Sequence, residues 1–177
     1  MTFSQWLYFG FGTLAVIPFG IRFLIQWIQS EKKGYSLVPS IFWRLSILGN
    51  FLLGTHYLIQ LQYHLYIIQI ITGYFATRQL YLQKHENPKS ISWINVLSKC
   101  AGIILGATLV FILRSYLALH TIKWIAVPQF AAKKENVSIL WHLLGICGAT
   151  IFCFRFWLQW WFAEFRNQNY LSRSFWW

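Results

Sequence analysis

An arginine and a glutamine spaced four residues apart occur twice within apolar sequence. Arg22 and Gln26 recur as Arg155 and Gln159 when the chain is shifted by 133 residues without a gap. Residues four apart lie on one face of a helix, so each pair would present a guanidinium and an amide together. A guanidinium can bind a phosphate through paired hydrogen bonds, and the amide can add neutral ones. The sequence therefore predicts an anion-binding site made by these four residues.

A second interpretation gives the two arginines no ligand. A charged residue within a membrane span costs about 2.5–3.5 kcal/mol on insertion scales, and a long side chain reduces this cost by reaching toward the interface. Arg22 is predicted two turns from the end of its helix, where Trp27 and its counterpart Trp160 would be interfacial residues. Glu31 and Glu164 would then pair with loop cations. Both interpretations stay open, and the repetition is the argument for a ligand.

The repeat extends beyond the Arg–Gln pairs. Across the 35 positions from Gly10 to Arg44, nine residues are identical to the residues 133 positions later. The other identities pair Gly12, Phe19, Phe23, Trp27, Glu31, Phe42 and Trp43 with Gly145, Phe152, Phe156, Trp160, Glu164, Phe175 and Trp176. A repeat of this kind indicates two structural units of similar fold. We expect Trp27, Glu31, Phe42, Trp43, Trp160 and Glu164 to form interface or loop motifs in these units.

The composition indicates a membrane protein. The chain of 177 residues is 57% hydrophobic and only 11% charged, whereas soluble domains carry about 25% charged residues. The net charge of +11 comes from cations that punctuate apolar runs, so anionic lipids are the expected partners and nucleic acid is not. The three cysteines lie in apolar runs without a CxxC motif, so we expect no metal and no cofactor. No pair of carboxylates lies within a span, so acid–base catalysis is not expected.

An all-α, polytopic fold is predicted from the apolar runs. A spanning helix needs about 20 mostly apolar residues, and the predicted spans are 5–29, 39–61, 63–82, 91–113 and 138–162, with a sixth starting near Leu171. This order gives a three-helix repeat at 1–83, a linker with one helix at 84–137, and a second repeat at 138–177. The second repeat stops within its second helix, so we expect the sequence to be part of a longer unit.

The cations predict the orientation of these spans. Nine cations fall on one predicted side, namely Lys32, Lys33, Arg44, Arg78, Lys84, Lys89, Lys99, Arg166 and Arg173. Four fall on the other side, namely Arg114, Lys123, Lys133 and Lys134. Because Lys and Arg are enriched on the cytoplasmic side, the first side is predicted to be cytoplasmic and the N-terminus to face out.

Several motifs resemble the lipid A biosynthesis N-terminal domain family. They are RFLIQW, Glu31, VPSIFWRLSILG and TRQLYL, and the resemblance covers residues 8–83 and again 140 onward. It implies a three-helix membrane unit with an architecture related to the SWEET and PQ-loop transporters. The family occurs alone or ahead of lipid-A-disaccharide synthase, a glycosyltransferase that joins UDP-2,3-diacylglucosamine to 2,3-diacylglucosamine 1-phosphate and releases UDP.

The resemblance implies a multi-pass module in the inner membrane of a Gram-negative-type bacterium. It would anchor a glycosyltransferase domain in cis or in trans and hold the phosphorylated acyl-glucosamine lipid. A transporter or flippase for a sugar or lipid phosphate is the alternative. A two-domain transferase needs on the order of 300 further residues at about 100–150 per domain, so we do not expect these 177 residues to catalyse the transfer alone.

Overall fold

The computed structural model describes residues 3–34, 38–85, 93–122, 124 and 139–166. The described part of the chain forms five helices and no strand: α1 (Phe3–Lys33), α2 (Ser40–Ile59), α3 (Tyr63–Lys84), α4 (Trp93–Leu119) and α5 (Ile139–Arg166). The all-α prediction is therefore confirmed.

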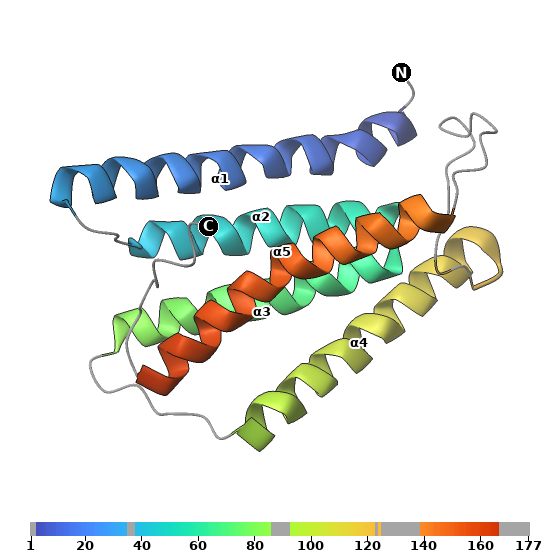
Figure 1. Cartoon of the computed structure of the whole chain (residues 1–177). Coiled ribbons are helices and arrows are strands. Elements are labelled where there is room, and N and C mark those ends of the chain that lie inside the picture. The colour runs from blue at the N-terminus through green and yellow to red at the C-terminus, as the bar shows by residue number, and fades with distance from the viewer. Residues whose placement is uncertain (1–2, 35–37, 86–92, 123, 125–138, 167–177) are drawn as a thin grey trace.

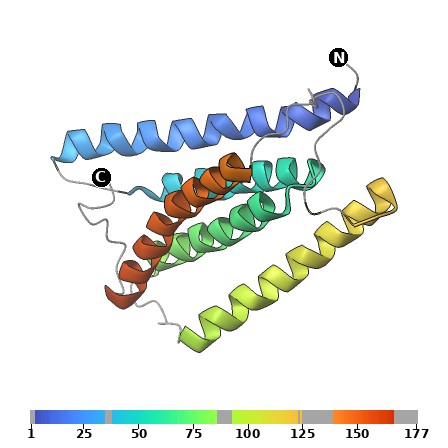
Figure 2. The same cartoon turned by 45° about the vertical axis from the view of Figure 1, so that its right-hand side comes forward.

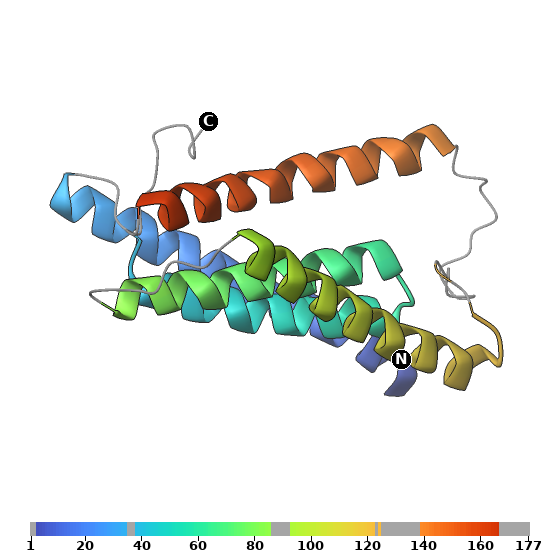
Figure 3. The same cartoon turned by 90° about the horizontal axis from the view of Figure 1, so that it is seen from below.

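Successive helices run in opposite directions, so α1, α3 and α5 share one direction (Figure 1). Helix α1 packs along α2, and α2 packs along α3. Helix α3 also contacts both α4 and α5, and α5 crosses it at an angle (Figure 2). Viewed from below, α5 lies along one side of α2 and α3, whereas α4 crosses in front of them (Figure 3). Helix α3 is therefore the element that connects the first three helices to the last two.

Several helix ends differ from the predictions, as α1, α4 and α2 illustrate. Helix α1 continues to Lys33, past the predicted end at residue 29, and stops at Gly34, whose φ of +68° suits a residue without a Cβ. Helix α4 continues to Leu119, six residues past its predicted end. Pro39 is the N-cap of α2 and precedes its first turn. The predicted break between α2 and α3 is confirmed, because the chain turns at Leu61 with φ +55°.

Two helical segments, Gly10–Lys33 and Ile94–Leu119, are long and apolar enough to cross a membrane. Helices α2 and α3 contain buried polar side chains, including Asn50 and Gln79. The plan of three helices, a linker helix and three more thus stays a prediction, and its sixth span from Leu171 lies outside the described residues.

Aromatic contacts join α3 to the two later helices. Near the start of α3, Tyr63 packs edge-on against Phe111 of α4 with ring centroids 5.2 Å apart. Its hydroxyl also lies 2.8 Å from the Thr108 hydroxyl. Farther along α3, Phe75 stacks on Trp160 of α5 at 5.0 Å. Helix α4 thus packs against the start of α3, and α5 packs near Phe75, where Val96 of α4 belongs to the same apolar cluster.

Two glycines allow α1 and α2 to approach closely. A Cβ added at Gly49 would lie 2.9 Å from the ring of Phe19, and one at Gly12 would lie 2.8 Å from the ring of His56. Real Cβ contacts are almost never this short. The absence of a side chain at each glycine therefore leaves room for a ring from the facing helix. The α1–α2 interface depends on both.

We predict that Gly49→Ala lowers the free energy of unfolding by about 1–3 kcal/mol, because the added methyl overpacks the site of Phe19. The control is Gly20→Ala, which meets nothing within 4 Å and should raise stability by about 0.5–1 kcal/mol. Thermal unfolding of the two variants in detergent, monitored by circular dichroism, measures the difference in stability. Equal stability of both variants would contradict the close α1–α2 packing.

Candidate anion-binding site

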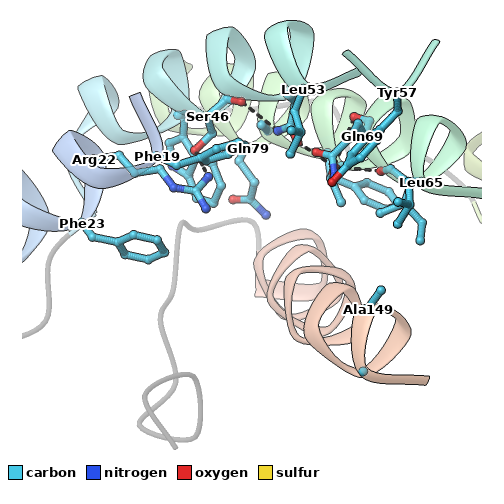
Figure 4. Close-up of a pocket in the computed structure, with 17 residues that line it drawn as sticks. Phe19, Arg22, Phe23, Ser46, Leu53, Tyr57, Leu65, Gln69, Gln79 and Ala149 are labelled. Atoms are coloured by element: carbon cyan, nitrogen blue, oxygen red, sulfur yellow. Dashed lines mark hydrogen bonds between the residues drawn. The ribbon is translucent and has the colours of Figure 1, made fainter. Parts of the chain in front are cut away.

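A cavity of about 550 Å³ lies among α1, α2 and α3, and α5 contributes Gly148 and Ala149 to its wall. One part is polar and is lined by Arg22, Ser46 and Gln79. The other part is lined by Leu53 and Leu65, with Tyr57 and Gln69 beside Leu65. Figure 4 shows Arg22 and Gln79 on the same side of the site, with Leu65 away from them. The cavity is therefore amphipathic along its length.

Arg22 is buried, with 4% of its surface exposed. Its Cζ lies 4.5 Å, 4.7 Å and 5.0 Å from the ring centroids of Phe19, Phe23 and Phe42. Its Nη1 donates a hydrogen bond of 2.7 Å to Ser46 Oγ. Each cation–π contact contributes about 0.5–2 kcal/mol, and these contacts offset part of the cost of removing the guanidinium from water.

A chain of hydrogen bonds extends from Arg22 across α2 to α3. Ser46 Oγ accepts from Arg22 and donates to the carbonyl oxygen of Phe42 at 2.7 Å. Asn50 Nδ2 donates to the carbonyl oxygen of Ser46 at 2.8 Å. The Thr72 hydroxyl of α3 lies 2.9 Å from Asn50 Oδ1. Four polar side chains thus connect the three helices along one wall of the cavity.

In the second interpretation, the Arg22 side chain reaches toward the membrane interface. The length of α1 and the direction of the side chain both bear on it. Arg22 lies eleven residues before Lys33, which is about 16 Å along the helix axis at ~1.5 Å per residue. Figure 4 shows the guanidinium directed toward Ser46 of α2. The side chain is therefore part of the interhelical packing.

Two other predicted positions on α1 differ in burial. Gln26 is fully buried, at 0% exposure, but it does not line the cavity. Trp27 is 60% exposed, as an interfacial residue would be. Glu31 is exposed and forms no ion pair within the described residues. Of the repeated residues on α1, Arg22 is thus the one with a polar group directed toward the cavity.

Three aromatic residues lie deeper than predicted. Phe42 and Trp43 were expected in an interface or loop motif, but they occupy the first turn of α2 and are buried in the core with Ala76 of α3. Trp160 was expected near an interface and is buried against Phe75. The reason is that Phe42 and Trp43 on α2, and Trp160 on α5, lie on helix faces that meet α3.

The second copy of the predicted site lies on α5. Arg155, Gln159 and Glu164 belong to this helix, but their side chains lie outside the described part of the chain. Helix α5 packs against α3 and reaches the cavity wall at Ala149. Whether Arg155 and Gln159 join Arg22 at one ligand stays a prediction.

Two cavity residues were not predicted to bind a ligand: Gln79 was not singled out, and Trp43 was expected only in an interface or loop motif. Gln79 is 1% exposed, and neither atom of its amide has a hydrogen-bond partner in the described structure. Trp43 Nε1 is also buried without a partner there. Both residues line the cavity. The sequence indication for Gln79 is its position inside the TRQLYL motif.

Comparison with known proteins identifies the first part of the chain. The family model described as Lipid A Biosynthesis N-terminal domain matches residues 11–81. These residues are similar to the lipid A biosynthesis N-terminal domain family. The match extends through most of α1–α3 and contains Arg22, Ser46, Asn50, Thr72 and Gln79. The described hydrogen-bonded chain and its cavity are therefore almost entirely within this domain.

Curated relatives match nearly the whole chain. Lipid-A-disaccharide synthase of Chlamydia trachomatis serovar D is 34% identical over 174 residues, 98% of this chain and 28% of the relative. The synthase of Chlamydia muridarum is also 34% identical over 174 residues, with the same coverage. That of Chlamydia pneumoniae is 30% identical over 172 residues, 97% of this chain and 27% of the relative. The chain thus spans about 28% of the first relative's length. No solved structure matches.

We predict that Ser46→Ala lowers the free energy of unfolding by about 1–3 kcal/mol, because the buried Arg22 Nη1 loses its acceptor. Ser98→Ala, at an exposed position of α4, is the control and should change stability by less than about 0.5 kcal/mol. Denaturant unfolding of both variants provides the comparison. A Ser46→Ala protein as stable as the control would contradict the hydrogen bond.

Proposed function

We propose that this chain is a membrane-embedded module of lipid A biosynthesis that binds the phosphorylated acyl-glucosamine lipid at Arg22. The observation that supports it most is a buried guanidinium on the wall of an amphipathic cavity, within residues that are similar to this family. The cavity has a cationic, polar part and an apolar part, which match the phosphate and the acyl chain of such a lipid.

Exposed apolar side chains support the membrane location. The outer surface of α1, α4 and α5 is covered by large hydrophobic residues, among them Ile17, Leu24, Leu105, Leu109, Leu144 and Ile151. A soluble monomer rarely exposes apolar patches of this extent. The bilayer would cover these surfaces, so that α1 and α4 are spanning helices and the other helices complete a multi-pass bundle.

The distribution of charge supports the proposed orientation. Helices α1 and α3 end on the same side of the molecule (Figure 1), and Lys32, Lys33 and Lys84 lie at these ends. Arg44 lies in the second turn of α2, next to them. Since Lys and Arg favour the cytoplasmic side, this end would face the cytoplasm of a bacterial inner membrane, with the N-terminus outside.

The glycosyltransferase itself would lie outside these residues. The relatives are named lipid-A-disaccharide synthase, and this chain matches about 28% of their length. We propose that the module serves such a transferase, in cis or in trans, by anchoring it and by holding the acceptor lipid beside it. The five described helices would then supply binding, while the chemistry of transfer belongs to the partner domain.

A transporter or flippase is the second candidate function, and the position of Arg22 favours it. Arg22 lies near the middle of the candidate span Gly10–Lys33. Secondary transporters bind their substrates near the bilayer midplane, between repeated units. A head group bound at this depth would already have left the interface. Translocation of a fluorescent lipid phosphate in proteoliposomes distinguishes this function from anchoring.

We predict that Arg22→Gln weakens binding of 2,3-diacylglucosamine 1-phosphate by about 10-fold or more, because a charge-assisted hydrogen bond contributes about 1.5–3 kcal/mol. The Arg22→Ala/Arg155→Ala double variant tests whether Arg155, in the second copy of the repeat, also contributes to the affinity for the lipid. Arg78→Gln is the matched control, since Arg78 is also buried but does not line the cavity. Native mass spectrometry from micelles measures the affinities. Unchanged binding by Arg22→Gln and by the double variant would remove the proposed site.

We predict that Leu109→Arg reduces membrane insertion of α4, because arginine at a helix centre costs about 2.5–3.5 kcal/mol on insertion scales. Leu109 is 69% exposed within the candidate span Ile94–Leu119, so the bilayer would surround it. A glycosylation-site insertion assay measures the effect, with Leu109→Ala as the control. Insertion of Leu109→Arg at the level of the alanine variant would argue that α4 does not face lipid.

A further inference from the structure

The Trp43 indole and the Gln79 amide face the cavity without a described partner, and the proposed phosphate contact does not use them. Both side chains are more than nine-tenths buried, and both residues line the cavity. A buried polar group without a partner is costly, so native proteins rarely keep one without a reason. Two such groups on one cavity wall indicate a ligand that supplies their partners.

The chemistry of these groups restricts the ligand. The indole can only donate a hydrogen bond, whereas the amide of Gln79 both donates and accepts. A phosphate without hydroxyls would satisfy the donors and leave the amide oxygen of Gln79 unmatched. A hydroxyl group satisfies both kinds of atom. The polar part of the cavity is therefore suited to a head group that has hydroxyls as well as a phosphate.

The apolar part of the cavity restricts the ligand further. Gln79 and Leu65 are fourteen residues apart on α3, which is about 21 Å along the helix axis at ~1.5 Å per residue. Leu53 and Ile68 also line the cavity, so a surface with more apolar than polar side chains, interrupted by Gln69, continues away from Arg22. A free sugar phosphate would leave this surface without a partner, whereas an acyl chain would cover it.

We propose that the cavity selects a phosphorylated sugar that carries an acyl chain, and that Gln79 and Trp43 recognise its hydroxyls. This inference rests on the proposed function and specifies how the same site distinguishes its lipid from other phosphate lipids. Arg22 binds the phosphate, the Gln79 amide and the Trp43 indole bind hydroxyls, and the chain lies along α3 toward Leu65. Gln79 and Trp43 are specificity-determining residues.

The test compares two lipids that share a phosphate and acyl chains. Native mass spectrometry measures the affinity of the protein for 2,3-diacylglucosamine 1-phosphate and for phosphatidic acid with equal chains. We expect the sugar lipid to bind about 10-fold more tightly, because phosphatidic acid leaves the amide oxygen of Gln79 unmatched. Equal affinity for the two lipids would overturn the inference.

Gln79→Leu and Trp43→Phe remove the polar groups while keeping apolar bulk. We expect Gln79→Leu to reduce the 10-fold preference to about 3-fold or less, and Trp43→Phe to reduce it in the same direction. The control is Gln83→Leu, one turn farther along α3, where the amide instead donates to the carbonyl oxygen of Val38 at 2.8 Å. This control should keep the preference. An unchanged preference in both cavity variants would overturn the inference.

Thermal stability separates recognition from a structural role. Without a ligand, Gln79→Leu should unfold at the same or a higher temperature than the native protein, because it removes an unsatisfied buried amide. A lower melting temperature, together with equal loss of affinity for both lipids, would mean that Gln79 only supports the fold. Failure of the proposed function is distinguishable, since Arg22→Gln would then leave both affinities unchanged.

Discussion

The burial of one guanidinium is the constraint on which the first three helices depend. A charge taken out of water without compensation costs several kcal/mol, so Arg22 requires polar and aromatic groups placed around it. Helix α1 supplies Phe19 and Phe23, and α2 supplies Phe42 and Ser46. Because these groups come from two helices, the arginine is compensated only when α1 and α2 are correctly packed.

The packing of α2 against its neighbours follows from this requirement. Gly49 gives room to the ring of Phe19, which lies over the guanidinium. Asn50 continues the hydrogen-bonded chain from Ser46 to Thr72 of α3. The cavity lies along these residues, so its polar part is fixed by the same contacts that hold the helices together. A rigid, preorganised site of this kind loses little entropy when it binds a ligand.

The sequence predicted the helices well because their apolar runs are long and separated by polar links. It could not predict that α1 extends to Lys33, because polar residues such as Glu31 and Lys32 are good helix formers and also common in loops. The repeat identified Arg22, but Ser46, Gln79 and Trp43 became recognisable as site residues only in the fold. Their roles depend on contacts between helices, which no local pattern contains. The side chains of Arg155 and Gln159 stay predictions.

The most direct measurement is photo-crosslinking with an acyl-glucosamine 1-phosphate that carries a diazirine on its acyl chain. If the cavity holds this lipid, mass spectrometry should find the label on α2 and α3 near Leu53 and Leu65, and an excess of the unlabelled lipid should remove it. Arg22→Gln should reduce the same label. Labelling confined to the outer face of α4, without competition by the unlabelled lipid, would contradict a lipid site inside the three-helix unit.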